Sequence, residues 1–261
     1  MPTVERYAPG EFCWIELATS NQDAAKNFYS ALFGWTVRDV PTGPGQVYSL
    51  LELQGRIAAA AFTISPGESA ASVPPHWHLY IAVASADEAA KKAGELGGKV
   101  KEAPFDVMDR GRAALIQDPT GAYFSLWEGK TRIGMGVTGD PGSFCWADLS
   151  TPDQARAKTF YEGLFGWKLK AGQGEESGYL HIVNGENYIG GVPPARHRDG
   201  NAPPHWLLYF AVTDVDETFR KAEGMQARVL LPPTDFERVG RVAVLADPQG
   251  AVFALFREAG K

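Results

Sequence analysis

The sequence repeats one long pattern twice, and this duplication constrains the fold more than any other feature. Residues 12–14 (Phe-Cys-Trp) recur 132 positions later at 144–146, and residues 74–77 (Pro-Pro-His-Trp) recur 129 positions later at 203–206. Shorter identities follow in the same order, so the pattern predicts two copies of one domain. We place the first domain at residues 1–128, a Gly-rich linker at 129–142 and the second domain at 143–261.

Each copy is predicted to begin with a strand and a helix. Residues 12–18 have the aromatic and aliphatic composition of a strand. Apolar residues at three- and four-residue spacing predict a helix from about Ser20 to Phe33, and Gly34 ends it. In the second copy, residues 151–154 (Thr-Pro-Asp-Gln) have the pattern of a capping box with Pro at the first helical position.

Further strands follow the first helix, and then the whole pattern starts again. Two apolar stretches joined at Gln54-Gly55 predict a hairpin. Residues 77–83 are typical of a strand, residues 87–96 of a helix, and a second hairpin turns across residues 118–121. Several strands for each helix favour an α+β fold with largely antiparallel sheets.

The composition excludes several classes of function. Asp and Glu number 31 against 25 Lys and Arg, and the basic residues are scattered, which argues against a nucleic-acid partner. Cys13 and Cys145 are too few for a disulfide framework or a zinc site, and we expect both to be buried and unreactive. No apolar run approaches the ~18 residues of a membrane helix, and the N-terminus lacks the features of a signal peptide. We therefore expect a cytoplasmic protein with no membrane partner.

Three motifs occur in both copies and resemble the vicinal oxygen chelate superfamily, which includes glyoxalases, bleomycin-resistance proteins and extradiol dioxygenases. They are a helix ending in Phe-Tyr-x-x-Leu-Phe-Gly-Trp, a strand with Trp-x-x-Tyr-x-x-Val, and Asp-Pro-x-Gly-x-x-Phe before the last strand. More closely, the chain is similar to two-domain glyoxalase-like proteins of actinobacteria that are labelled hydroxylase or antigen. The resemblance implies a tandem repeat of two domains, each made of two βαβββ modules. These form a cup-shaped mixed, largely antiparallel sheet with the ligand inside the cup.

The resemblance also implies where metal ligands would lie, and few of these positions carry a ligating side chain. In each copy one position lies on the first strand, one on the strand after Pro-Pro, and one seven residues after the Asp of Asp-Pro. They fall on Phe12, His78 and Ser125 in the first copy, and on Phe144, Leu207 and Ala254 in the second. A fourth position, usually Glu, falls in residues 58–61 and near residues 190–191. Since a divalent metal needs three or four converging ligands, we expect no cofactor.

One alternative metal site remains in the first copy. His76 and His78 alternate along one strand and can therefore share a face. Together with Glu16 from a neighbouring strand they would make a two-His-one-carboxylate set, which binds iron in some enzymes. In this alternative His78 and Glu16 are the candidate catalytic residues.

Side chains that alternate along the strands are expected to line each cup. If the ligand positions point inward, Trp14 and Glu16 lie inside beside Phe12, and His76 lies on the same face as His78. The residues that we expect to contact a ligand are aromatic, acidic or imidazole side chains: Trp14, Glu16, His78, Tyr80, Tyr123, Trp127, Trp146, Asp148, His205 and Tyr209. Such a lining favours a flat ligand that is apolar or cationic.

Structural interpretations of the same residues stay open. The aromatic residues could fill collapsed cups as ordinary core. The Pro-Pro-His-Trp motif is more typical of a turn in which His bonds the backbone. Glu16 and Asp148 would be costly to bury unpaired, and a salt bridge with Arg112 or Arg241 is an alternative to a ligand contact.

Three functions follow from these observations. The leading interpretation is a metal-free protein that binds a small molecule for sequestration or sensing. The second is a metal-dependent glyoxalase-like lyase or dioxygenase that works through the first domain. The third is a regulatory protein-binding module. Because the duplication supplies two domains that can pair within one chain, we expect a monomer or a homodimer.

Overall fold

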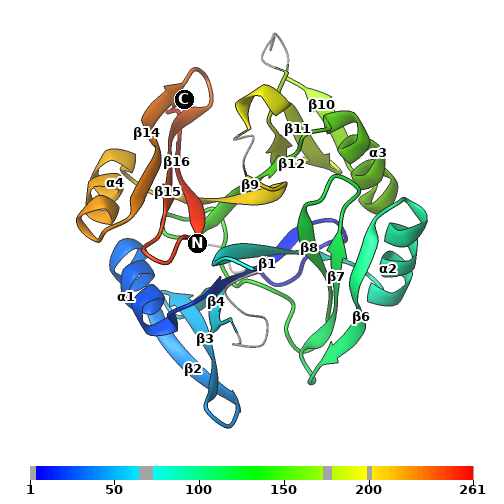
Figure 1. Ribbon diagram of the computed structural model, residues 1–261, viewed down its shortest axis with the longest axis horizontal. Coiled ribbons are helices and arrows are strands. Elements are labelled where there is room, and N and C mark those ends of the chain that lie inside the picture. The colour runs from blue at the N-terminus through cyan, green and yellow to red at the C-terminus, as the bar shows by residue number, and fades with distance from the viewer. Residues whose placement is uncertain (1–3, 65–72, 173–177, 199–201, 261) are drawn as a thin grey trace.

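Two eight-stranded sheets, one from each half of the chain, form the protein (Figure 1). The structure is a computed structural model that describes residues 4–64, 73–172, 178–198 and 202–260. The first sheet has the order β2 (Thr36–Gly43), β3 (Gln46–Leu53), β4 (Arg56–Thr63), β1 (Phe12–Thr19), β5 (His76–Ala82), β8 (Tyr123–Gly129), β7 (Gly111–Gln117), β6 (Lys99–Val107). The second has the order β10 (Lys168–Ala171), β11 (Leu180–Asn184), β12 (Asn187–Val192), β9 (Phe144–Ser150), β13 (His205–Ala211), β16 (Val252–Glu258), β15 (Gly240–Ala246), β14 (Arg228–Phe236).

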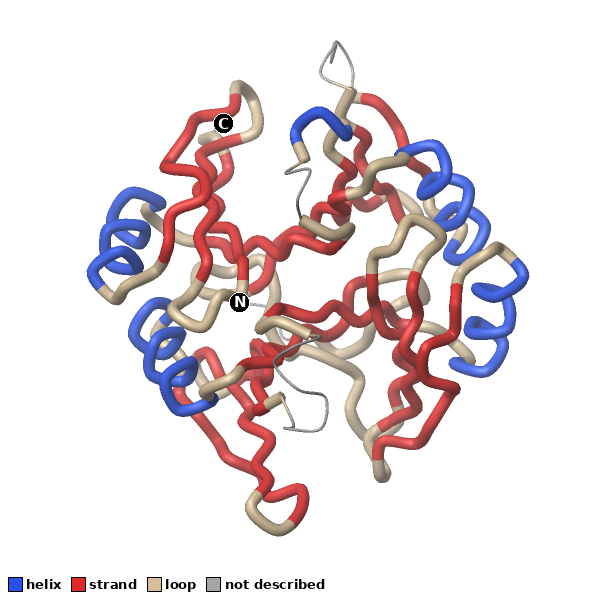
Figure 2. The backbone as a smooth tube through the Cα atoms, in the orientation of Figure 1, coloured by secondary structure: helices blue, strands red, loops and turns tan. Residues whose placement is uncertain are grey.

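The two orders are the same, which confirms the duplicated α+β fold. Each sheet contains two parallel pairs of neighbouring strands: β1–β4 and β5–β8 in the first sheet, and β12–β9 and β13–β16 in the second. The other neighbours pair antiparallel. All strands of one sheet come from one copy, so the modules pair within a copy. Each sheet is curved, and we call the concave face of the first sheet the first cup and that of the second sheet the second cup. Figure 2 shows the helices on the outer sides of both sheets.

The helices are α1 (Gln22–Phe33), α2 (Ala86–Glu95), α3 (Gln154–Phe165) and α4 (Val215–Gly224), with a short 3₁₀ turn at Ala195–His197. The predicted capping box at residues 151–154 is wrong by two residues. Asp153 is the N-cap of α3, and its side chain accepts a hydrogen bond of 2.9 Å from the Arg156 amide. Thr151 instead accepts from the Asp153 amide, which leaves Pro152 outside the helix. Asp caps a helix as well as Thr does, so the motif alone does not fix the first residue.

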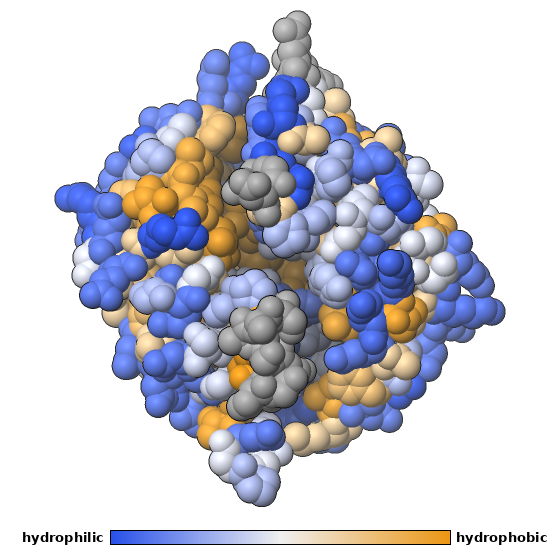
Figure 3. Space-filling model, in the orientation of Figure 1, coloured by the Kyte–Doolittle hydropathy of each residue, from blue (hydrophilic) through white to orange (hydrophobic). Residues whose placement is uncertain are grey.

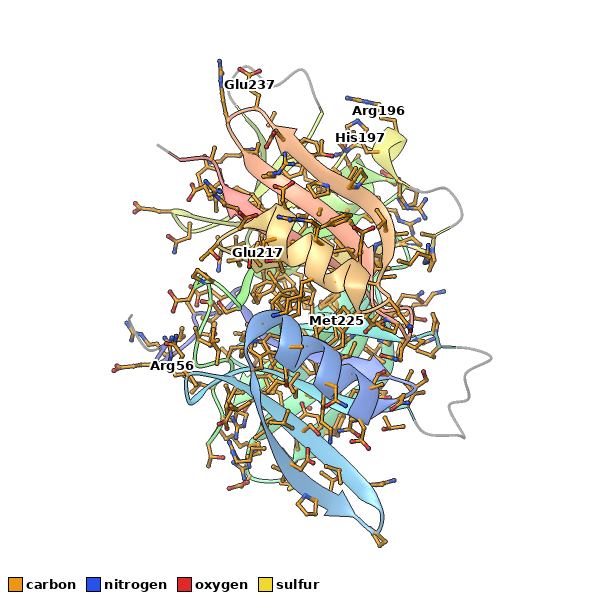
Figure 4. The ribbon with its side chains drawn as sticks, turned by 90° about the vertical axis from the view of Figure 1, so that its left-hand side faces the viewer. Arg56, Arg196, His197, Glu217, Met225 and Glu237 are labelled. Carbon is orange, nitrogen blue, oxygen red and sulfur yellow. The ribbon has the colours of Figure 1, made fainter. Side chains whose placement is uncertain are left out.

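The two sheets lie back to back, and their cups open in opposite directions in Figure 1. Helix α1 packs beside α4, as Figure 4 shows, and α2 packs beside α3. Two of the repeated motifs meet across this interface. The Tyr29 hydroxyl of α1 donates to Asp247 at 3.0 Å, and the Tyr161 hydroxyl of α3 donates to Asp118 at 2.9 Å. The helix motif of each domain therefore binds the Asp-Pro turn of the other.

A bulge at the start of β1 changes which residues face the first cup. Trp14 pairs with Tyr80, but Phe12 pairs with Ile81, so the register shifts by one residue between them. Phe12 consequently points into the domain interface, where its ring lies 6.1 Å from that of Phe144. The expectation that Phe12 and Phe144 face the cups is wrong, because a bulge interrupts the alternation on which it rests.

The segment that joins the two sheets packs closely against the first domain. Its Met135 is fully buried, and the Met135 amide donates to the Cys13 carbonyl at 2.8 Å. A Cβ on Gly134 would lie 2.3 Å from that same carbonyl oxygen, so this close approach requires glycine. The segment therefore places its side chains, including Arg132, at a fixed position beside β1.

Among the described residues, no helix is long and apolar enough to cross a membrane.

Candidate functional site

A buried carboxyl group held by two tyrosines lies on the floor of the first cup. The Tyr80 hydroxyl donates to one oxygen of Glu16 at 2.5 Å, and the Tyr48 hydroxyl donates to the other at 2.6 Å. The Trp14 indole N–H donates in turn to the Tyr48 oxygen at 3.1 Å. Burial raises the pKa of Glu16 in spite of these hydrogen bonds, which favour the ionised form. We call these four residues the first acid clamp.

The second cup contains the same arrangement with a shorter acid. Tyr179 donates to one oxygen of Asp148 at 2.6 Å, and Tyr209 donates to the other at 2.8 Å. The Trp146 indole bonds both the acid, at 3.0 Å, and the Tyr179 oxygen, at 3.1 Å. Burial again raises the pKa of the acid. These four residues are the second acid clamp.

The register of the sheets shows what surrounds each acid. In the first sheet a row of paired positions runs from β3 through β4 and β1 to β5, and in the second the matching row runs from β11 to β13. The first row is Leu50, Ala60, Glu16 and His78; the second is His181, Gly191, Asp148 and Leu207. Each row therefore contains one acid and one histidine, but the histidine lies on opposite sides of the acid.

Gly191 adjusts the second row to its shorter acid. A Cβ placed on Gly191 would lie 1.7 Å from the Tyr179 hydroxyl oxygen, so this tyrosine occupies the space of a side chain. The equivalent residue of the first cup, Ala60, is fully buried and keeps its methyl group. Asp is one methylene shorter than Glu, and its tyrosine must therefore approach the sheet more closely. The fourth metal-ligand position that the resemblance implies lies near residues 190–191, and there the Tyr179 hydroxyl occupies the space beside Gly191.

The two histidines of the Pro-Pro-His-Trp motifs bond the backbone, as the turn interpretation predicts. His76 Nδ1 lies 2.9 Å from the Pro74 carbonyl oxygen, and His205 Nδ1 lies 2.8 Å from that of Pro203. His78 lies deeper, and its Nε2 is 2.8 Å from the Ser125 hydroxyl. Burial, with a smaller contribution from His76, lowers the pKa of His78 to about 3. His78 is therefore neutral at neutral pH.

The donors present do not fit the metal site of the alternative hypothesis. Both Glu16 oxygens face tyrosine hydroxyls, and the ring nitrogens of His76 and His78 described above face a carbonyl and a hydroxyl. In the part of the chain that the structure describes, no group of three or more His, Cys, Asp or Glu side chains could hold a metal ion. No step of a reaction can therefore be assigned to a metal held by these residues.

The salt-bridge alternative for the two acids is wrong. Arg112 pairs with Asp87 at 2.7 Å, and Arg241 pairs with Asp216 at 2.6 Å. Both arginines thus bond acids at the N-terminal ends of α2 and α4 rather than acids of the cups. Tyrosine hydroxyls take the place that the arginines were expected to fill.

The remaining predicted residues lie along the walls of the cups. Tyr123 is 41% exposed. Trp127 is buried, and its indole donates to the Arg132 carbonyl at 3.0 Å. Cys13 is buried as expected, whereas Cys145 is only partly buried. Burial raises the thiol pKa of both, for Cys145 to about 12.

A hollow is visible in the second half of the molecule. Figure 3 shows it between the β14–β16 side and the β10–β12 side of the second sheet, with an apolar wall on the β14–β16 side. A separate depression of about 710 Å³ lies between the start of α1 and the ends of β2–β4. It is lined by polar residues such as Gln22, Asp39 and Thr63, with Tyr48 of the first acid clamp at its border.

Several residues of the site escape the motif analysis. Tyr48 and Tyr179 lie 131 positions apart, between the two repeat distances, so a search of the repeat at that spacing would find them. His181 has no histidine at the equivalent position of the other copy, and the counterpart of Arg132 is Lys261. Only the positions of Arg132 and His181 in the folded protein link them to the cups.

Comparison with known proteins gives consistent results. The family model described as "Glyoxalase/Bleomycin resistance protein/Dioxygenase superfamily" matches residues 12–126 and 143–255. "Putative glyoxylase CFP32" of Mycobacterium tuberculosis is 39% identical over 267 residues, which cover 99% of both chains. "Anthracycline biosynthesis protein DnrV" of Streptomyces peucetius is 33% identical, over 96% of this chain and 94% of the relative.

Solved structures share the fold at low sequence identity. The Mn(II)-bound glyoxalase from Novosphingobium aromaticivorans aligns with a TM-score of 0.64 at 16% identity, over 95% of this chain and 82% of that chain. A variant of Homoprotocatechuate 2,3-Dioxygenase from B. fuscum in complex with HPCA aligns with a TM-score of 0.66 at 16% identity, over 99% and 74%.

Proposed function

Since the chain belongs to the glyoxalase/bleomycin resistance protein/dioxygenase superfamily, we propose that it is a metal-free member that binds a small molecule inside its cups, for sequestration or sensing. The acid clamps carry this proposal. Both cups keep a buried acid with two tyrosines and a tryptophan, although the residues beside the acid differ between the copies.

The chemistry of the cup walls supports an organic ligand. The aromatic side chains of Trp14, Tyr80 and Trp127 make this wall flat and apolar, and hydrogen bonds of the clamp and of the linking segment hold them in place. The clamp hydroxyls are committed to the acid, so they fix the shape of the floor. The relative named for anthracycline biosynthesis also supports a small organic molecule as the ligand.

Calorimetric titration with 2-naphthamide, a flat neutral probe, tests this proposal. Protein treated with EDTA should bind the probe saturably, and elemental analysis of protein purified without a chelator or His-tag should find metal well below one equivalent. Leu115 and Val244 are half-buried equivalents on the concave faces of the two sheets. Leu115→Glu should abolish binding in the first cup, and Val244→Glu should abolish it in the second. If neither variant reduces binding of the probe, the proposal is wrong.

A metal-dependent lyase or dioxygenase acting through the first domain is the second candidate. The relative named glyoxylase and the Mn(II)-bound structural neighbour favour it. It requires near-stoichiometric iron, zinc, manganese or nickel that disappears in His78→Ala, together with turnover that depends on the metal. That result would replace the binding function. Specific capture of a protein that both cup variants leave unchanged would support a regulatory module instead.

A further inference from the structure

The charge of the ligand can be inferred from a cation beside the first cup. Arg132 follows β8 in the segment that joins the two domains. Trp127 donates to its carbonyl at 3.0 Å, which fixes its backbone. Its guanidinium carbon lies 5.7 Å from the centre of the Trp14 ring, which belongs to the first acid clamp. The half-buried guanidinium therefore lies at the end of the cup formed by Trp14 and Trp127.

Arg132 has no acidic partner among the described residues. Glu52, an acid near enough to affect its pKa, pairs with Arg38 at 2.7 Å. Asp109 pairs with Arg110 at 3.2 Å. Burial and the neighbouring cations Arg110 and Arg38 lower the pKa of Arg132, and the smaller opposing effect of Glu52 comes from an acid that is already paired with Arg38.

The titratable groups on the floor of the first cup are shifted toward their uncharged forms. Burial raises the pKa of Glu16 and lowers that of His78, so it disfavours a charge on either side chain. A second cation, Lys101 on β6, lies 5.9 Å from the centre of the Tyr123 ring. The sequence analysis expects an apolar or cationic ligand, but the arrangement of charges favours an anion.

We propose that the first cup binds a flat organic anion, an aromatic carboxylate or ionised phenol, whose charged group pairs with Arg132 while its ring packs on the aromatic wall. This inference rests on the proposed binding function and adds the chemical class of the ligand. A guanidinium stacked on Trp14 is oriented in advance and can bond a carboxylate through two N–H groups.

The second cup provides the comparison. The position equivalent to Lys101 is Leu230, and the position equivalent to Arg132 is Lys261, which lies outside the described residues. Its β14 wall is apolar, with Leu230 43% exposed. The cation on the β6 wall of the first cup therefore has no charged equivalent on the β14 wall of the second.

The test compares 2-naphthoate with 2-naphthamide, which differ in charge but hardly in shape. Binding is measured by calorimetry at low salt in the Val244→Glu background, which leaves the first cup available. We expect naphthoate to bind about tenfold more tightly than naphthamide, as for one charge-assisted contact. Arg132→Gln should bring the ratio to about one by weakening only naphthoate, and Arg132→Lys should keep part of the preference.

Arg110→Gln is the matched control, because it removes a nearby cation that is already paired with Asp109. It should leave most of the preference in place. If naphthamide binds as tightly as naphthoate, or if Arg132→Gln leaves the ratio unchanged, the inferred ligand class is wrong while the binding function stands. If neither probe binds in a way that Leu115→Glu abolishes, both the inference and binding in the first cup are wrong.

Discussion

The two cups share an acid and differ in almost everything around it. Each has a buried carboxyl group that accepts hydrogen bonds from two tyrosines. In the first cup a histidine stands on β5 and a serine on β8; in the second, leucine and alanine occupy these positions and the histidine lies on β11. Cations stand over aromatic rings in the first cup, whereas the β14 wall of the second is apolar.

Under the proposed binding function, this difference separates the residues that maintain the fold from the residues that would contact a ligand. A clamp that persists through such divergence fixes the shape of the floor in both copies. The positions that vary are those that would contact a bound molecule. We therefore expect the cups to bind different ligands, and exchange of residues between them tests this interpretation.

The largest expected effect concerns His78 and acid pH. The pKa of His78 is about 3 in the folded protein, below its ordinary value of 6.5, so the unfolded chain takes up the proton first as pH falls. His78 therefore costs stability below pH 6.5, by about 3 kcal/mol between pH 7 and pH 4. The double variant His78→Leu/Ser125→Ala, which copies the second cup, should lack this loss.

Urea unfolding of the wild type and the double variant from pH 7 to pH 4 measures the difference. Because both proteins keep all other titrating groups, the change with pH in their difference isolates His78. A difference that stays constant over this range would show that the surroundings of His78 do not lower its pKa as the structure implies. His76→Ala is the control and should retain most of the acid sensitivity.

The next effect concerns the second acid clamp, where the short side chain of Asp148 requires Tyr179 to lie directly against Gly191. Gly191→Ala forces Tyr179 away from Asp148, and we expect it to destabilise the protein by about 1–3 kcal/mol. Adding Asp148→Glu recreates the Glu16–Ala60 pair of the first cup and should recover at least half of the loss. The free energy of unfolding of both single variants and the double variant gives the coupling.

Ala60→Gly is the matched control in the first cup, since it removes a methyl group that no tyrosine displaces. It should cost only about 0.5–1 kcal/mol, the ordinary effect of glycine in a regular element. Equal losses in Gly191→Ala and Ala60→Gly, or additive behaviour of Gly191→Ala with Asp148→Glu, would contradict the length argument.

The sequence predicts the architecture well because duplication and motif spacing are visible in one chain. Edge strands are harder to predict. β2 and β6 are exposed and contain Pro41 and Pro104, which weaken any strand pattern and are tolerated only because these strands lie at the sheet edges. A bulge near Cys13 shifts the register of β1, and Phe12 packs against Phe144 of the other domain, so alternation alone misplaces Phe12.

The site is predicted only in part for a similar reason. The acids, Tyr80 and Tyr209 follow from alternation on strands that carry repeated motifs. Tyr48 reaches Glu16 from a strand 32 residues away, and Arg132 reaches Trp14 from the linking segment. Such contacts depend on how distant segments pack, and the pattern of a single strand contains no information about them.

A smaller effect concerns the ionisation of the two acids. Burial raises the folded pKa of Glu16 above 4.5 and that of Asp148 above 3.8, so the folded state keeps a proton that the unfolded chain releases. Each acid therefore adds stability at low pH, and this contribution is lost as pH rises through the folded pKa. As pH rises, the free energy of unfolding of the wild type should fall relative to that of Glu16→Gln or Asp148→Asn, by about 1 kcal/mol for each unit by which the acid's pKa is raised.

Urea unfolding at pH 4, 6 and 8 measures this trend in both cups. As pH rises, Glu16→Gln and Asp148→Asn should both become more stable relative to the wild type. If the wild type instead becomes more stable relative to either variant, the hydrogen bonds from the tyrosines outweigh burial in that cup.

The smallest effect tests whether the arginines outside the cups influence the acids inside them. Arg112 and Arg241 occupy equivalent positions and pair with acids on the surface, so Arg112→Gln and Arg241→Gln should barely change the urea midpoint. Neither variant should alter the pH dependence that Glu16→Gln and Asp148→Asn reveal. A shift of that dependence in one cup alone would show that its acid interacts with the arginine after all, and that the two clamps differ in how they are held.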